Sequence, residues 1–183
     1  ARKHLKKALQ LDERCVRATL MLADLDMDNG QYAKAIERLG HIPQQDIAHI
    51  PTMLPALQRA YARHDDLAGL ETHLYQLLGE APYTSVIVAL GTLVHQRVGV
   101  DSAIERTGEW LAEAPSLGGL DYLIDLYLES ERLMGKETPD TRLMLLKHHT
   151  KALMSGRPRQ RCRRCGFSSD SLAWQCPSCR RWG

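Results

Sequence analysis

Four cysteines near the end of the chain are the residues best suited to chemistry. They form two CxxC pairs, Cys162 with Cys165 and Cys176 with Cys179, and ten residues separate the pairs. One CxxC turn can direct two thiolates at a single ion while backbone amides donate to the sulfurs. Two such turns complete a tetrahedral four-sulfur site. The spacing therefore predicts one zinc or iron ion bound by Cys162, Cys165, Cys176 and Cys179.

The segment around these cysteines is too small to fold by burying apolar surface. Its expected core is Phe167, Leu172 and Trp174, so metal binding must supply the folding energy, on the order of 10–16 kcal/mol for a structural zinc site. A saturated sulfur shell leaves no open position for catalysis. A redox dithiol is the alternative for each pair, but the mutual spacing of the two pairs disfavours it. We predict a four-cysteine module over residues 157–183, similar to zinc ribbons and rubredoxins.

Motifs for other chemistry are absent from the sequence. The fifth cysteine, Cys15, stands alone, so the pattern is not a disulfide framework, and clustered CxxC pairs indicate a reducing compartment. His148 and His149 are adjacent on an expected helix and do not share a face. No nucleophile elbow, phosphate loop or HExxH motif is present, which predicts a protein that is not an enzyme, with no catalytic residues.

Charge is distributed unevenly along the chain. From residue 157 onward the sequence has seven arginines and one acid, a net charge of +6, which leaves −4 for the rest. These are Arg157, Arg159, Arg161, Arg163, Arg164, Arg180 and Arg181. Such a tail could bind nucleic acid, or dock on the acidic body or on anionic lipid headgroups. We favour docking on the acidic body or on anionic lipid headgroups. We expect no nucleic acid, because the aromatic residues Phe167 and Trp174 are needed inside the module.

The elements that must carry this module show a repeat. Residues 35–40 read AIERLG and residues 103–108 read AIERTG, at an offset of 68. Half of that offset is 34, the length of the tetratricopeptide unit. Residues 69–74 between them read GLETHL, which keeps the small residue, the aliphatic residue and the glutamate. The alternative is an ordinary closed helical bundle in which the match is a coincidence.

A 34-residue frame divides the chain into helical hairpins. It places small residues where two helices must approach closely, at Ala35, Gly69 and Ala103, although Asp26 departs from the pattern at an apolar position. The expected fold is all-α, a tetratricopeptide-type superhelix over residues 1–156 followed by the metal module. Its repeats are predicted at about 16–49, 50–83 and 84–117, with a degenerate capping pair at 117–155. The chain opens inside an earlier repeat, so we expect a missing N-terminal part that holds a membrane anchor.

A partner protein is expected in the concave groove, because the first helix of each hairpin lines that surface in such superhelices. The frame places ten candidate partner-binding residues there: Arg17, Leu20, Asp24, Met27, Leu54, Gln58, Tyr61, Val88, Thr92 and His95.

The combination of repeats and cysteine motif resembles a known family. Tetratricopeptide hairpins followed by CxxCGF, then WxCPxCxxW at the end of the chain, are similar to the lipopolysaccharide assembly protein B family of Gram-negative bacteria. The resemblance covers the whole chain, and the cysteine motif is its specific part. It implies a rubredoxin-type metal role for the four cysteines. Arg180 follows Cys179 where rubredoxins have glycine, which weighs against a redox-active iron.

The family resemblance also implies a function. Its members are non-enzymatic adaptors on the cytoplasmic face of the bacterial inner membrane, where they bring the lipid A pathway deacetylase to a membrane-bound AAA+ zinc protease and so limit lipopolysaccharide synthesis. The present fragment would be soluble, and whether it forms a homo-oligomer stays open. The rival interpretations are a rubredoxin-type electron carrier on a repeat scaffold and a nucleic-acid-binding zinc ribbon.

Overall fold

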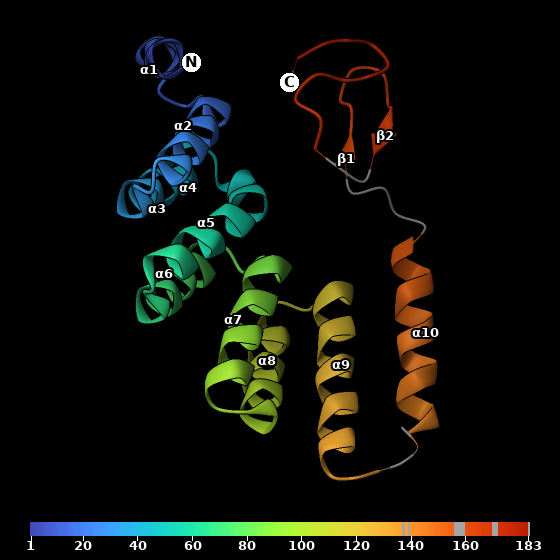
Figure 1. Ribbon diagram of the computed structural model, residues 1–183. Helices are drawn as coiled ribbons and strands as arrows, with labels where there is room; N and C mark the ends of the chain where they lie inside the picture. The colour runs from blue at the N-terminus through green and yellow to red at the C-terminus, as the bar shows by residue number, and fades with distance from the viewer. Residues whose placement is uncertain (137, 139, 156–159, 170–171, 183) are drawn as a thin grey trace. The chain divides into compact units, whose positions relative to one another are not determined.

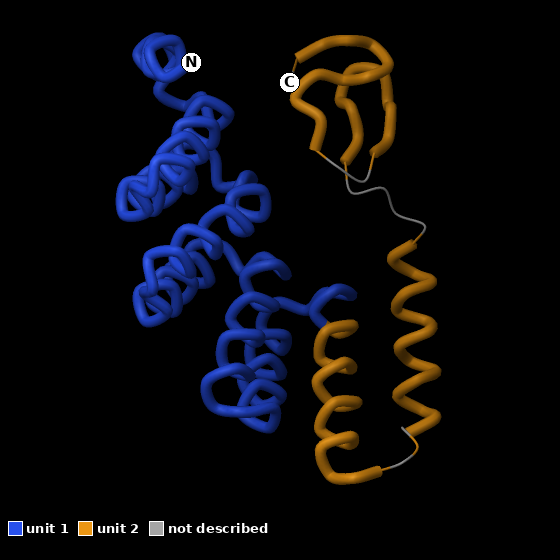
Figure 2. Tube along the Cα trace, in the orientation of Figure 1, with its two compact units in different colours: residues 1–119 blue, residues 120–183 orange. Residues whose placement is uncertain are grey.

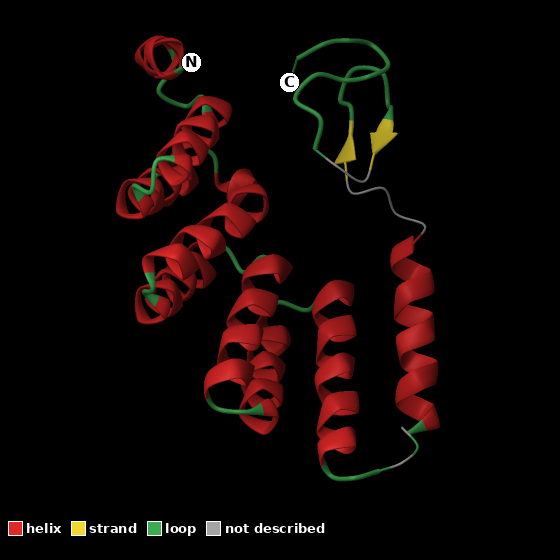
Figure 3. Ribbon diagram, viewed as in Figure 1, coloured by secondary structure: helices red, strands yellow, loops and turns green. Residues whose placement is uncertain are grey.

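The computed structural model describes residues 1–136, 138, 140–155, 160–169 and 172–182 (Figure 1). The chain separates into two compact units, residues 1–119 and residues 120–183 (Figure 2). The first unit consists of helices joined by short loops, and the second adds a small segment with two short strands (Figure 3).

The helices follow one another with few residues between them. They are α1 (Arg2–Leu11), α2 (Val16–Asp28), α3 (Tyr32–Gly40), α4 (Ile42–Gln45), the 3₁₀ turn η1 (Ile47–His49), α5 (Ile50–His64), α6 (Leu67–Glu80), α7 (Thr84–Arg97), α8 (Val100–Glu113), α9 (Leu117–Leu133) and α10 (Thr141–Ser155).

The first unit is a stack of equally spaced hairpins. Its α2, α5 and α7 begin at Val16, Ile50 and Thr84, which are 34 residues apart, and each is followed by an antiparallel partner, α3, α6 or α8. Within the stack α3 packs on α5, α6 packs on α7, and α5 contacts both α2 and α7. Because each hairpin contacts only its neighbours, the architecture is a helical repeat and not a closed bundle. The expected all-α fold of tetratricopeptide type is confirmed.

Residues with a left-handed backbone turn the chain between the two helices of each hairpin. Gly30 has φ +70° and Gly99 has φ +124°, values that cost glycine little because it has no Cβ. The middle hairpin uses Asp65 with φ 58°, followed by Asp66, whose carboxylate accepts a hydrogen bond from the Gly69 amide at 2.8 Å. That bond caps the start of α6.

The core of the stack lies between the helices of neighbouring hairpins. The small side chains of Ala23, Ala35 and Ala103 are fully buried, which lets the helices approach closely. Leu57 occupies the position equivalent to Ala23 in the middle repeat and is also fully buried. The first repeat differs from the others because its α3 ends at Gly40 and is followed by the short elements α4 and η1.

Asp26 departs from the apolar repeat pattern because it binds two arginines. Its side chain is completely buried in α2 and accepts hydrogen bonds from Arg2 of α1 and Arg38 of α3. Burial by itself would raise the pKa of Asp26, but the hydrogen bonds and charges of Arg2 and Arg38 outweigh it and hold that pKa below its usual value. One carboxylate therefore links three helices.

Within the second unit, polar contacts join α9 and α10. The Lys147 ammonium, buried in α10, donates to Asp121 at 2.7 Å and to Asp125 at 2.6 Å, both in α9. Thr150 Oγ1 donates to the Asp121 carboxylate at 2.9 Å. Burial acts to lower the pKa of Lys147, but the two carboxylates more than compensate and raise it.

The predicted boundary between residues 156 and 157 lies outside the described residues, so the predicted domain limits stay a proposal. Within the described ranges, no helix has both the length and the apolar character needed to cross a bilayer.

Candidate metal centre

The cysteine segment is built from two small β-hairpins. Strands β1 (Gln160–Arg161) and β2 (Ser168–Ser169) pair antiparallel, with Gln160 opposite Ser169. An isolated bridge joins Gln175 to Trp182 in the second hairpin. Each hairpin therefore closes around one CxxC pair, and residues far apart in the sequence can present their sulfurs to a common point.

Each CxxC pair and the two residues after it form one metal knuckle, residues 162–167 for the first and residues 176–181 for the second. The two knuckles have the same pattern of backbone hydrogen bonds. In the first, the Cys162 amide donates to the Phe167 carbonyl at 2.8 Å and the Gly166 amide donates to the Cys162 carbonyl at 3.0 Å. In the second, the Cys176 amide donates to the Arg181 carbonyl at 2.9 Å and the Arg180 amide to the Cys176 carbonyl at 2.8 Å. Each turn holds the first cysteine of its pair at both the amide and the carbonyl.

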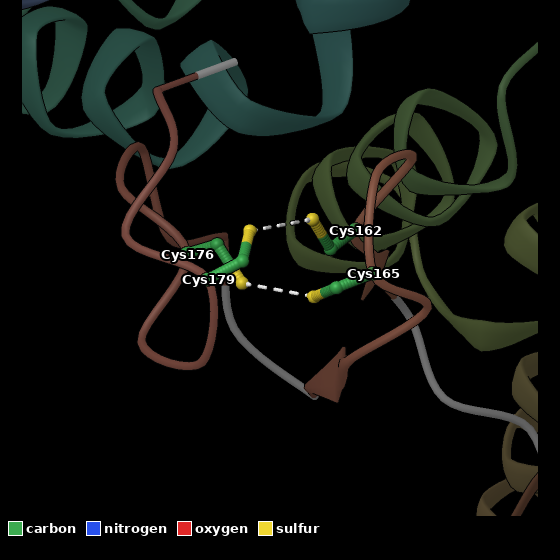
Figure 4. Close-up of side chains that lie close together, drawn as sticks. All are labelled: Cys162, Cys165, Cys176 and Cys179. Atoms are coloured by element: carbon green, nitrogen blue, oxygen red, sulfur yellow. Dashed lines mark hydrogen bonds between the residues drawn. The ribbon is translucent and has the colours of Figure 1, made fainter.

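The four sulfurs lie at the distances that one tetrahedral ion requires. Cys162 Sγ is 3.8 Å from Cys179 Sγ, and Cys165 Sγ is 3.6 Å from Cys176 Sγ (Figure 4). All four lie within 4.8 Å of one another. A metal–sulfur bond of about 2.3 Å gives a tetrahedron with edges of about 3.8 Å. The donor set therefore fits zinc or iron, both of which accept four thiolates.

The local environment gives the thiols of Cys162, Cys165 and Cys179 different pKa values. Backbone N–H groups of Cys165 and Arg164 lower the pKa of Cys162 to about 6. The Phe167 amide likewise lowers the pKa of Cys165. At Cys179, the Arg181 amide acts to lower the pKa, but burial and the neighbouring cysteines raise it to about 11. The first knuckle is thus poised to supply thiolates, the form that binds metal.

The apolar side chains of this segment are less buried than expected. Leu172 and Trp174 are half-buried, but Phe167, expected in the core, is 40 % exposed. So little burial agrees with folding driven by metal binding. Arg161, Arg163, Arg164, Arg180 and Arg181 are exposed, while Arg157 and Arg159 lie outside the described residues.

The ten candidate groove residues all lie on the first helices of their hairpins, in α2, α5 and α7. Asp24 is exposed, and seven others are half-buried: Arg17, Leu20, Met27, Gln58, Val88, Thr92 and His95. Leu54 is 3 % exposed and Tyr61 is 7 % exposed. The Tyr61 hydroxyl also lies 3.1 Å from His73 Nδ1 of α6. Leu54 and Tyr61 therefore belong mainly to the packing of the stack.

Two further sequence features have plain structural positions. Cys15 is half-buried and stands at the residue that precedes α2, far along the sequence from the other cysteines. His148 and His149 are both exposed on α10, with ring centroids 5.6 Å apart in an edge-on arrangement. Neither feature joins the four-cysteine cluster.

A pocket in the first repeat was not predicted from the sequence. Its lining residues come from α1, the α1–α2 loop, α2, α3 and α4. No motif marks this pocket, because it depends on side chains that the fold brings together from positions 9 to 45. The departure of Asp26 from the repeat pattern was the available signal, since Asp26 holds one of the lining residues, Arg38.

Comparison with known families gives one match near each end of the chain. Residues 1–48 match the family described as Tetratricopeptide repeat, and residues 161–183 match the family described as Rubredoxin metal binding domain. The solved structure of MamA protein covers 85 % of this chain and 78 % of its own, at 19 % identity and a TM-score of 0.44.

Curated relatives match nearly the whole chain. Lipopolysaccharide assembly protein B of Escherichia coli strain K12 is 30 % identical over 179 residues, 97 % of this chain and 45 % of that protein. The protein of the same name from Haemophilus influenzae is 31 % identical over 182 residues, 97 % of this chain and 44 % of that protein. The chain spans about half the length of these relatives. These matches confirm the resemblance inferred from the sequence: the chain is a homologue of the lipopolysaccharide assembly protein B family.

Proposed function

We propose that this chain is the repeat and metal-binding part of a non-enzymatic adaptor that regulates lipopolysaccharide biosynthesis. It would bring the lipid A pathway deacetylase to the membrane-bound AAA+ protease on the cytoplasmic face of the bacterial inner membrane. The observation that carries the proposal is the match over 97 % of the chain to proteins named lipopolysaccharide assembly protein B. A stack of helical hairpins provides the extended surface that such binding needs.

The surface proposed for partner binding runs along α2, α5 and α7. Because Leu54 and Tyr61 are buried, the other eight candidates supply most of the accessible side chains. Asp24 is the most accessible of them, and Gln58 lies half-buried in the next hairpin. Both side chains can be changed without opening the core, which makes them the best probes of this surface.

The metal module is proposed to act by holding a fixed shape. Cys162, Cys165, Cys176 and Cys179 would hold one zinc or iron ion, whose contribution is to join the two knuckles through coordination bonds. With four sulfurs bound, the shell leaves no position for a substrate. The exposed arginines around it make the module a basic surface that can bind an acidic partner.

Reconstituted degradation tests the adaptor function. The deacetylase is incubated with the membrane protease and the full-length protein, its Cys176→Ser variant, or its Cys15→Ser variant as the matched cysteine control. Faster deacetylase loss with the wild type and with Cys15→Ser, and no acceleration with Cys176→Ser, is the expected result. Equal rates with and without the wild type would refute the adaptor proposal.

Binding measurements test the groove separately. The Asp24→Ala and Gln58→Ala double variant should weaken capture of the deacetylase or the protease by about tenfold, whereas Glu37→Ala should not. Glu37 is the control because it is an exposed carboxylate on α3, the second helix of the same hairpin as Asp24. Unchanged affinity of the double variant for both proteins would exclude this surface.

A further inference from the structure

The four cysteines of the metal module differ in their exposure to solvent. Cys165 is exposed, Cys162 and Cys179 are half-buried, and Cys176 is buried, with 7 % of its surface exposed. Oxidation of cysteines depends on exposure as well as on thiolate character, and metal ligands are thiolates. A small oxidant in solution therefore meets Cys165 first and Cys176 last.

The exposed and the buried cysteine face each other across the two knuckles. Cys165 Sγ lies 3.6 Å from Cys176 Sγ, and the two sulfurs point toward each other (Figure 4). A disulfide bond is about 2.05 Å long, so the two sulfurs need to approach by only about 1.6 Å to form one. Cys176 is thus placed to react with an oxidised Cys165, although solvent hardly reaches it.

We propose that Cys165 is the residue at which a peroxide oxidises the metal module, and that Cys176 completes the reaction by forming a disulfide with it. The Cys165 thiolate attacks one oxygen of the peroxide, which breaks the O–O bond and yields a sulfenic acid and hydroxide. The Cys176 sulfur then attacks the Cys165 sulfur, the S–S bond forms, and the sulfenic oxygen leaves as hydroxide. The two cysteines give up two electrons, and both peroxide oxygens end as water after they take up protons.

The disulfide would remove two of the four metal ligands. A sulfur in a disulfide is no longer the thiolate that zinc or iron needs, so only Cys162 and Cys179 would remain and the ion would be released. Because the module buries little apolar surface, it would lose its fold together with the ion. This inference rests on the proposed metal role of the four cysteines and not on the adaptor function.

The geometry also distinguishes this reaction from that of a redox dithiol, in which the two cysteines of one CxxC pair form the disulfide. The sulfur of Cys162 lies 3.8 Å from that of Cys179, so this second close contact also joins the two knuckles. The expected disulfides therefore connect one knuckle to the other.

Oxidation of the zinc-loaded chain tests the proposal. Hydrogen peroxide is added to the full chain after its zinc content has been measured, and zinc release is followed with a chromophoric chelator. Trypsin can cut after Arg164 and chymotrypsin after Trp174, which separates Cys162, Cys165 and the peptide that holds Cys176 and Cys179. Mass spectrometry with fragmentation of the linked peptides then identifies the pairing.

Zinc release together with a disulfide between Cys165 and Cys176 is the expected result. Zinc that stays bound under peroxide, or release with disulfides mainly within the CxxC pairs, would overturn the proposal. A reduced chain that binds no zinc would refute the proposed metal role and this inference with it.

Histidine variants separate the roles of the cysteines. Histidine can replace cysteine as a zinc ligand but forms neither a sulfenic acid nor a disulfide. Cys165→His should slow zinc release by peroxide about tenfold, whereas Cys162→His, which keeps the exposed and the buried cysteine, should release zinc about as fast as the wild type. Cys15→Ser, outside the cluster, should also match the wild type. Equal slowing by both histidine variants, or no slowing by Cys165→His, would contradict the assignment. If Cys165→His binds no zinc, the disulfide mapped in the wild type decides.

Discussion

Gly166 and Arg180 occupy equivalent positions in the two metal knuckles. Each follows the second cysteine of its pair, and the amide of each donates to the carbonyl of the first cysteine. Both have a left-handed backbone, with φ 76° at Gly166 and φ 54° at Arg180. Only Gly166 lacks a Cβ, so the second knuckle carries a backbone cost of about 1–2 kcal/mol that the first avoids.

Replacing Arg180 with glycine should therefore tighten metal binding. Relief of that backbone cost predicts an increase in zinc affinity of about tenfold, measured by competition with a chromophoric chelator. Arg180→Ala is the matched control, because it removes the same charge and keeps the Cβ. If Arg180→Ala tightened binding as much as Arg180→Gly, the side-chain charge and not the backbone would be responsible.

The converse change is Gly166→Ala. A Cβ at Gly166 would meet no atom closer than Arg161 Nη2 at 3.5 Å, so space does not oppose it. The positive φ remains costly for alanine, and the zinc affinity should fall by about tenfold. Affinity equal to that of the wild type would show that this turn does not need a left-handed residue.

Metal removal should unfold the cysteine module and leave the repeats intact. The repeats have their own buried core, from Leu22 and Leu39 to Leu57 and Leu90, whereas the module buries little apolar surface. Addition of a strong chelator should abolish the dispersion of the module's NMR signals while helical circular dichroism at 222 nm changes by less than about a tenth. Parallel loss of both signals would mean that the repeats depend on the module.

We expect the stability of the repeat stack to fall at acid pH because of Asp26. Because its pKa is lower in the folded chain than the ordinary value of 3.8, the unfolded chain binds the proton first. The stabilisation is complete above about pH 4 and is lost as the pH falls through the folded pKa. Asp26→Asn should lower the free energy of unfolding by about 3 kcal/mol at pH 7 and reduce the loss of stability at acid pH, both measured by urea titrations. Asp24→Asn, at an exposed position on the same helix, should leave the loss of stability at acid pH unchanged.

We expect a second pH dependence of the stability, nearer to neutral pH, because of His73. Burial lowers the pKa of His73 below 6.5, although the charge of Glu80 acts in the opposite direction. The unfolded chain then binds a proton more readily, so stability falls as the pH drops from about 6.5 toward the folded pKa. His73→Gln should remove this slope in urea titrations between pH 7.5 and pH 5. His64→Gln, at an exposed position, should leave this slope of stability with pH unchanged.

Loss of the Tyr61 hydroxyl should cost stability at neutral pH. Tyr61→Phe removes the bond to His73 Nδ1 and keeps the ring, at a cost of about 1 kcal/mol. The measurement is the urea midpoint at pH 7.5, with an unchanged slope on denaturant as the check that the fold is kept. A midpoint equal to that of the wild type would show that the hydroxyl contributes nothing to the stack.

The repeat period was predictable because small residues are needed where helices cross. Ala35 and Ala103 can be found from sequence since any larger side chain there would separate the helices. The four cysteines were predictable for a similar reason, because the CxxC turn is itself the binding geometry. In both cases the structure requires particular residue types at a fixed spacing, and a sequence pattern shows such a spacing directly.

Features that depend on distant residues could not be predicted in the same way. Asp26 departs from the apolar pattern, but its partner Arg2 lies in a different hairpin. Tyr61 was expected in the groove, yet His73 in the facing helix draws its hydroxyl into the stack. Phe167 was expected in the module's core because it is aromatic, and its exposure reflects a module held by sulfur and not by apolar packing.

The contacts of Lys147 specify one alignment of α10 against α9. Its ammonium must reach both Asp121 and Asp125, which lie one turn apart on α9. Sliding α10 by one turn, about 5.4 Å, would break at least one of these two contacts and the bond from Thr150 to Asp121. The apolar residues Met144, Leu145 and Leu146 are exposed and impose no such penalty. These polar contacts together favour the observed register, and their main contribution is to the specificity of the final hairpin.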